Sequence, residues 1–101
     1  MSATFEPGPH GGGALVVRGE IDLANAAELD AALTAWPADE DVTVDLSAVE
    51  YLDSAGIKVL FEHARRRRLR VVLADDTIIA ALIRASRLDG VAVVEVRARG
   101  S

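Results

Sequence analysis

The sequence predicts an α/β fold, in which a mixed, mostly parallel β-sheet has helices packed against it in the order β-β-α-β-α-β-α-β. Short aliphatic segments of strand length alternate with segments whose apolar residues recur every three to four positions. Strands that alternate with helices are typical of parallel sheets joined by right-handed crossovers. Half of the 101 residues are hydrophobic but only 4% are aromatic, so the core is expected to be aliphatic.

The first strands lie on either side of a turn-forming segment. Residues 14–18 are an aliphatic run ending in Arg18, which predicts a buried strand. The Pro- and Gly-rich residues 7–13 precede it as a loop, so residues 4–6 can form only a short edge strand. Residues 19–22 are expected to carry the chain out of the sheet. Three further strands are expected, at residues 42–47, 71–73 and 91–96.

Apolar side chains recur at helical spacing in three segments. They are Leu29, Leu33 and Trp36 in the first, Ile57, Leu60, Phe61 and Ala64 in the second, and Ile78, Ile79, Leu82 and Ile83 in the third. The first helix is expected from Leu23 until Pro37 ends it. The second is expected to begin near Ser54 and end in the arginine run 65–68, because positive charge is favourable at a helix C-terminus. Thr77 is expected to cap the third helix and Gly90 to close it.

Length and composition predict one domain spanning residues 1–101, with the edge strand and Gly/Pro loop in 1–13 and the core in 14–96. The chain has no cysteine, which excludes disulfides and a cysteine nucleophile. It begins with no signal-like segment and has no apolar run near about 18 residues, so we expect a cytoplasmic protein without membrane association.

The net charge of −5 is unevenly distributed. Residues 1–53 hold one basic and eleven acidic residues, whereas residues 54–101 hold ten basic and five acidic residues. A front half this acidic disfavours a nucleic-acid partner, because phosphate binding needs an excess of Lys and Arg. Charge asymmetry of this kind more often indicates a protein partner, or has no functional meaning.

Most polar clusters favour a structural interpretation. His10 and His63 have no paired ligand pattern, so we expect an exposed loop residue and a surface helix residue. Residues 11–13 lack the pattern of a phosphate-binding loop, and 39–41 lack the spaced ligands of a calcium loop. The run 65–68 points around a helix, which indicates a solvated face. We therefore expect no metal, no cofactor and no catalytic residue.

Residues 51–57 are expected where a strand ends and a helix begins, the usual functional edge of an open α/β sheet. Asp53 can cap the helix, which leaves Ser54 in its first turn near unpaired backbone N–H groups. Two interpretations stay open: simple helix capping, or a phosphoacceptor serine at a helix N-terminus that tolerates negative charge. A hydrolytic nucleophile fits less well, because no His base or nucleophile-elbow motif is nearby.

Three segments together resemble the STAS domain, and within it the stand-alone bacterial anti-sigma factor antagonists. They are Val-Arg-Gly-Glu-Ile-Asp at 17–22, Val-Asp-Leu-Ser at 44–47 and Leu-Asp-Ser-Ala-Gly at 52–56. The resemblance spans about residues 14–96 and includes the order of elements. It implies a STAS-like fold and a partner-switching binding module, not an enzyme.

Antagonists of this kind bind an anti-sigma factor that is also a serine kinase, and so displace the sigma factor. The kinase phosphorylates the serine directly after Asp in the motif, here Ser54, which abolishes binding until a PP2C-type phosphatase restores it. Asp22 falls in the family's loop that faces the partner. The resemblance therefore implies partner-binding residues at Asp22, Asp53, Ser54, Ala55 and Gly56.

The sequence departs from the family pattern at three places. Ala55 stands where many relatives have Ser or Thr, which leaves Ser54 as the only hydroxyl there. Pro7 and Pro9 shorten the first strand, and the family's usual last helix has no counterpart before Ser101. The alternatives are a constitutive STAS scaffold or transporter-accessory module without phosphorylation, and a nucleotide-binding domain, which the missing phosphate loop disfavours.

Overall fold

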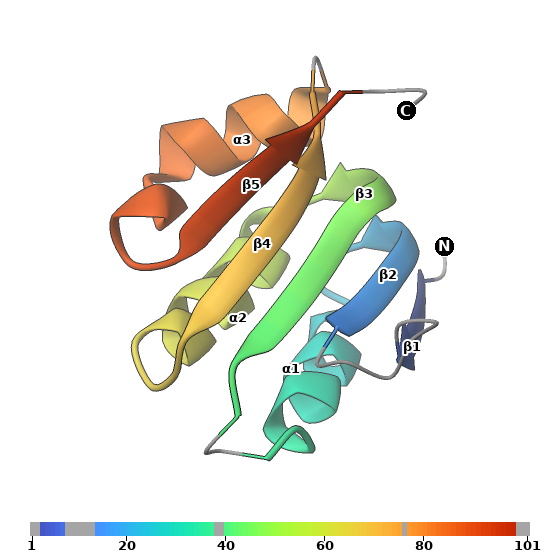
Figure 1. Ribbon diagram of the computed structural model, residues 1–101. Coiled ribbons are helices and arrows are strands. Elements are labelled where there is room, and N and C mark those ends of the chain that lie inside the picture. The colour runs from blue at the N-terminus through green and yellow to red at the C-terminus, as the bar shows by residue number, and fades with distance from the viewer. Residues whose placement is uncertain (1–2, 8–13, 38–39, 76, 99–101) are drawn as a thin grey trace.

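The computed structural model describes residues 3–7, 14–37, 40–75 and 77–98. The elements follow the predicted order: β1 (Ala3–Pro7), β2 (Ala14–Ile21), α1 (Ala26–Thr34), β3 (Val42–Leu52), α2 (Ser54–Ala64), β4 (Leu69–Ala74), α3 (Ile78–Ser86), the 3₁₀ turn η1 (Leu88–Gly90) and β5 (Val93–Arg97). One five-stranded sheet has the strand order β1-β2-β3-β4-β5 (Figure 1). β1 is antiparallel to β2 and the other pairs are parallel, which confirms the mixed, mostly parallel α/β fold.

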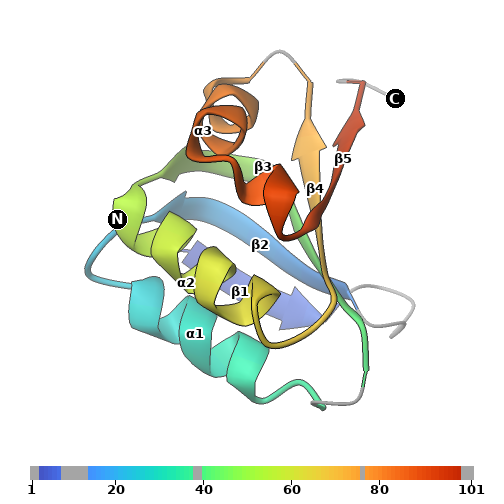
Figure 2. The same ribbon diagram turned by 90° about the vertical axis from the view of Figure 1, so that its left-hand side faces the viewer.

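All three helices pack on one face of the sheet (Figures 1 and 2). Consecutive parallel strands joined by crossovers of the usual hand place their helices on the same side. Alternate residues of β2, β3 and β4 form a single aliphatic core with the helices. Its members include Leu15, Val17, Val44, Leu46, Val71 and Leu73 from the strands and Leu29, Leu60 and Ile83 from the helices. The opposite face of the sheet has no helix among the described residues.

β3 is longer than the predicted strand, because it continues to Leu52. Its buried residues are Val42, Val44 and Leu46 at the expected spacing of two, and then Val49 and Leu52 at a spacing of three. The pairing of β2 with β3 shifts register twice over this stretch. Such bulges add a residue to one strand and reset its alternation, so the sequence pattern stops before the strand does.

Residues 19–21 remain in β2, so the expectation that they leave the sheet is wrong. Gly19 has a φ of 94°, a left-handed conformation that glycine adopts without a side-chain clash. It lies at the second register shift, where the strand bends but keeps pairing as far as Ile21 and Leu52.

The helix boundaries differ from the predicted ones at three points. α1 begins at Ala26 instead of Leu23, and it ends at Thr34, so that Trp36 lies half-buried beyond its last turn. α3 ends at Ser86, because Arg87 adopts a left-handed φ of 62° and the chain continues into η1. β5 consequently begins at Val93, two residues after the predicted start.

Ile78 is 69% exposed, so its predicted core position is wrong. It is the first residue of α3, directly after the cap Thr77, whose Oγ1 accepts a hydrogen bond from the backbone N–H of Ala80. Ile79 and Ile83, four residues apart, form the stripe of α3 that enters the core, which leaves Ile78 facing outward.

His63 is 3% exposed, so its predicted surface position is also wrong. It lies in the last turn of α2, and its Nε2 is 2.6 Å from Oδ1 of Asp30 on α1. A buried polar ring needs such a partner, and the sequence spacing gave no sign of one 33 residues away.

The arginine run follows the last residue of α2, and Arg67 joins the two helices. Its guanidinium donates hydrogen bonds to the carbonyl oxygens of Leu33 at 2.7 Å, Trp36 at 3.1 Å and Pro37. Arg67 therefore adds side-chain donors to carbonyls in and just after the last turn of α1. The prediction of a solvated face is wrong for Arg67, whereas the other three arginines are exposed.

The predictions for His10, residues 11–13 and Asp39 fall outside the described residues.

Candidate functional site

The ends of β2 and β3 lie side by side and bring two acidic residues to one edge of the sheet. Ile21 pairs with Leu52, each the last residue of its strand. Asp22 and Asp53 follow directly, and the backbone N–H of Asp53 donates to the carbonyl of Ile21 at 3.1 Å. Asp22 and Asp53, 31 positions apart in the sequence, are thus brought together at the carboxyl ends of parallel strands. Open α/β sheets usually have their binding sites at this edge.

The Asp53 carboxylate binds both segments that leave these strands. Its Oδ1 accepts hydrogen bonds from the N–H groups of Ala55 at 2.9 Å and Gly56 at 3.4 Å, which confirms it as the cap of α2. Its Oδ2 accepts from the N–H of Leu23 at 3.0 Å. One side chain therefore fixes the first turn of α2 relative to the loop between β2 and α1.

A reciprocal pair of polar residues shapes that loop. Asp22 Oδ1 accepts hydrogen bonds from the N–H groups of Ala24 at 2.9 Å and Asn25 at 3.3 Å. Asn25 Oδ1 in turn accepts from the N–H of Asp22 at 2.9 Å, and its Nδ2 donates to the carbonyl of Glu20 at 2.8 Å. Asn25 is 6% exposed, and the sequence reasoning missed it. The Asp-x-x-Asn spacing of Asp22 and Asn25 is similar to that of a capping box and could have predicted this pair.

Ser54 is exposed as the first residue of α2. In the described part of the chain its hydroxyl makes no hydrogen bond. Ala55 is half-buried behind it. Gly56 is buried, and a Cβ added to it would lie 2.5 Å from Leu52 Cδ1 and 2.8 Å from Ile21 Cγ2. The five residues of the predicted site are thus adjacent, but Ser54 is presented to solvent while Gly56 lets α2 approach the strand ends.

The Asp53 carboxylate lies next to Ser54, and two first-turn amides are already used. Because Asp53 accepts from the N–H groups of Ala55 and Gly56, a phosphoryl group on Ser54 finds these donors occupied. The N–H groups of Ala55 and Gly56, expected to be unpaired, are therefore already hydrogen-bonded. An added phosphate would also lie next to the Asp53 carboxylate, with a repulsion that the N-terminal end of the helix offsets only in part.

Ser54 has no nearby base among the described residues. His63, the described histidine, lies nine residues further along α2, which is about 14 Å at the helical rise. A serine nucleophile needs a base within hydrogen-bonding distance.

Three large apolar side chains are exposed on segments near the carboxyl ends of β2, β3 and β4. Leu23 is 81% exposed, Ile78 is 69% exposed and Tyr51 is 46% exposed. Leu23 follows β2, Tyr51 is near the end of β3, and Ile78 begins α3 after β4. The sequence reasoning placed Ile78 in the core and did not single out the other two as contacts. Exposed apolar residues grouped around polar ones are typical of a protein-binding surface.

The described residues hold neither a membrane-crossing helix nor a cluster of metal ligands. None of the helices there combines the length and the apolar character needed to cross a bilayer. No group of three or more His, Asp or Glu side chains in the same residues is placed to hold a metal ion.

The fold and the site define a STAS module, and the comparisons with known proteins agree. The family model described as "Mlab, STAS domain" matches residues 8–95. The chain belongs to the STAS-domain family.

Relatives of the chain include anti-sigma factor antagonists. The anti-sigma-F factor antagonist RsfB of Mycobacterium tuberculosis is 44% identical over 62 residues, which cover 58% of this chain and 51% of RsfB. The chain thus spans about half the length of the curated relatives it matches.

Two solved structures have the same fold. The crystal structure of an anti-sigma factor antagonist from Mycobacterium paratuberculosis has a TM-score of 0.81 and 31% identity, covering 93% of this chain and 86% of that one. Unphosphorylated SpoIIAA, an anti-sigma factor antagonist, has a TM-score of 0.54 and 15% identity, covering 85% of this chain and 99% of that one. At that identity the likeness concerns the fold alone.

Proposed function

We propose that this chain is an anti-sigma factor antagonist controlled by phosphorylation of Ser54. In its unphosphorylated form it binds an anti-sigma factor serine kinase and releases the sigma factor. The kinase then transfers the γ-phosphoryl group of ATP to Ser54 Oγ, with release of ADP and the hydroxyl proton, and binding is lost. A PP2C-type phosphatase removes the phosphoryl group and restores binding. The proposal describes a binding module, not an enzyme.

The observation that carries this proposal is the presentation of Ser54. Its hydroxyl is exposed at the start of a helix whose position Asp53 fixes through three hydrogen bonds. Asp22 and the exposed Leu23 lie on the loop that Asp53 holds. A rigid, acidic and partly apolar edge around one accessible hydroxyl suits both a kinase and a binding partner. The names of the relatives support an antagonist of an anti-sigma factor.

Phosphorylation tests the proposal directly. We expect a purified anti-sigma factor kinase, chosen from the genes beside this one, to add one phosphoryl group in the presence of ATP, measured by intact mass. Ser54→Ala should remain unmodified. Ser47→Ala is the matched control, because Ser47 is also exposed but its hydroxyl donates to Asp45 Oδ1 at 2.6 Å. Modification of Ser54→Ala to the wild-type level would contradict the proposal.

The constitutive scaffold is the alternative that a binding experiment separates from the switch. A scaffold uses the same edge of the sheet without modification. It predicts that the affinity of the wild type for the partner is the same with and without ATP. The phosphorylation switch predicts that ATP lowers the affinity of the wild type and leaves that of Ser54→Ala unchanged.

A further inference from the structure

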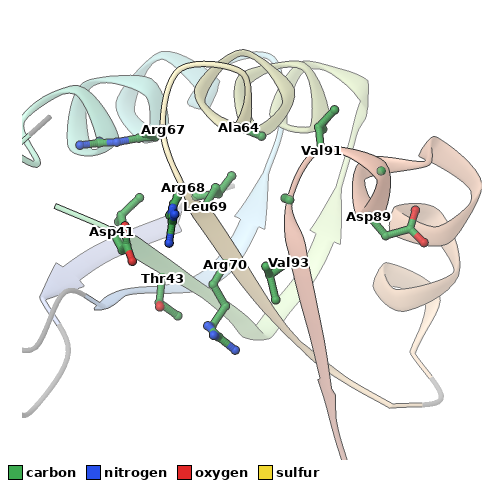
Figure 3. A pocket seen from close by; sticks show the side chains of 13 residues that line it. Asp41, Thr43, Ala64, Arg67, Arg68, Leu69, Arg70, Asp89, Val91 and Val93 are labelled. Atoms are coloured by element: carbon green, nitrogen blue, oxygen red, sulfur yellow. The ribbon is translucent and has the colours of Figure 1, made fainter. Parts of the chain in front are cut away.

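A groove of about 580 Å³ lies at the edge of the sheet opposite to Ser54 (Figure 3). It is formed by the first residues of β3, β4 and β5 together with η1 and Ala64, the last residue of α2. Ser54 is the first residue of that 11-residue helix, so about 15 Å of helix separates the two sites. The groove is therefore distinct from the proposed partner-binding edge.

Arg68 is the available cation in this groove. Arg67 extends toward α1, where it donates to backbone carbonyls (Figure 3). Arg70 donates to Glu95 Oε1 at 3.2 Å, and a hydrogen bond from Arg97 lowers the pKa of Glu95, which keeps that carboxylate ionised beside Arg70. Arg68 is exposed, and its guanidinium has no hydrogen-bond or ion-pair partner within the described ranges, although its backbone carbonyl accepts from the N–H of Val42.

Uncovered apolar surface lies in the same groove as this cation. Val91 is 42% exposed and Val93 is 56% exposed, and both line the groove. Arg70 lies in register between Thr43 on β3 and Val93 on β5, so guanidinium and valine are neighbours across two strands (Figure 3). A molecule with a charged head and an apolar body can contact both kinds of surface at once.

Two acidic residues on the rim limit the charge of such a molecule. Asp41 and Asp89 line the same groove and both are exposed. They repel a ligand that carries several negative charges, such as a nucleoside triphosphate, while Arg68 can neutralise a single one. The charges and the apolar surface therefore favour a singly charged amphiphile over a polyanion.

We propose that the groove binds a small amphiphilic monoanion, with its carboxylate head at Arg68 and its apolar body against Val91 and Val93. The volume lies within the range of small-molecule sites, which is roughly 300–1,000 Å³. The binding is independent of Ser54 and of the phosphorylation switch.

Decanoate is a suitable probe, titrated into the isotopically labelled protein and followed by NMR. We expect the backbone amide signals of residues 90–93 to shift, with a dissociation constant near 1 mM, on the order expected for about a dozen heavy atoms. Arg68→Ala should weaken binding about threefold to tenfold, as for an exposed charge-assisted contact. Asp89→Asn should tighten binding. Arg65→Ala is the matched control, because Arg65 is exposed in the same run but does not line the groove.

Several results would overturn the proposal. Amide signals of residues 90–93 that stay unmoved at about ten times the expected dissociation constant would exclude the site. If Arg65→Ala and Arg68→Ala weakened decanoate binding equally, the binding would reflect the overall positive charge and not a site at Arg68. Acetate binding as tightly as decanoate would remove the role of the valines, and tighter binding of ATP would refute the preference for one charge. Binding to phosphatidylglycerol vesicles without binding of free decanoate would indicate a membrane surface instead.

Discussion

The backbone N–H of Leu23 donates a hydrogen bond of 3.0 Å to Oδ2 of Asp53, the residue that also caps α2 with its other carboxylate oxygen. The exposed Leu23 and the exposed Ser54 are thus held in a fixed relation by one side chain, which directly precedes Ser54 and reaches the loop of Leu23. If both contact the partner, the surface is already in place before binding, which lowers the ordering cost of association.

Replacement of Asp53 tests this relation. Asp53→Ala should lower the free energy of unfolding by about 1–2 kcal/mol, the usual cost of a lost helix cap. Asp53→Asn should cost less, because its amide oxygen can still accept from the N–H groups of Ala55 and Gly56 while the contact to Leu23 is lost. Urea denaturation measures both values. Equal stability of the Ala variant and the wild type would show that the cap does not hold α2.

Gly56 should be intolerant of even one methyl group. Gly56→Ala meets Leu52 Cδ1 at 2.5 Å and Ile21 Cγ2 at 2.8 Å, so overpacking outweighs the gain in helix propensity, and we expect a loss of about 1–2 kcal/mol. Gly90→Ala is the control, because its added Cβ has nothing within 4 Å. Thermal unfolding of both variants distinguishes them. A Gly56→Ala protein as stable as the control would contradict the close approach of α2.

The pair formed by His63 and Asp30 should stabilise the packing of α1 on α2. Asp30→Asn should cost about 0.5–1.5 kcal/mol, a modest value because the Asp30 side chain is 53% exposed. A double-mutant cycle with His63→Gln isolates the contact. Glu28→Gln, another exposed acidic position on α1, should change stability little. A coupling energy of zero in the cycle would show that the 2.6 Å contact contributes nothing.

The acidic edge should accelerate binding of a basic partner surface. Asp22→Asn removes a charge while its amide oxygen can keep the turn to Ala24 and Asn25, so it should lower the association rate more than it raises dissociation. Raising the salt from about 0.05 to about 0.5 M should slow association of the wild type as the Debye length falls to a few ångströms. Stopped-flow kinetics measures both. An association rate independent of salt would remove the electrostatic argument.

The sequence predicted the order of the elements and the position of Ser54, because both depend on local patterns. The cap at Asp53 follows from residue type and position, and the aliphatic runs identify β2 and β4. The end of β3 could not be predicted, since two bulges break its alternation after Leu46 although its pairing with β2 continues.

Contacts between distant segments were also beyond prediction. The burial of His63 depends on Asp30, and the position of Arg67 depends on carbonyls such as that of Leu33 in the last turn of α1. Both partners are more than 30 residues away, and neither pair has a periodic signal. The exposure of Ile78 was missed for a local reason. Its spacing matches the apolar positions of α3, but as the first residue of the helix its side chain points away from the core.

The affinity of this protein for the proposed anti-sigma factor kinase, measured for the Ser54→Ala and Ser54→Asp variants, tests the central claim most directly. A desolvated, unpaired charge at an interface costs about 2–5 kcal/mol, so Ser54→Asp should bind about 30-fold or more weakly than the wild type. Ser54→Ala should bind nearly as well as the wild type and should not lose affinity when ATP is added. Equal dissociation constants for the Ala and Asp variants would contradict the phosphorylation switch.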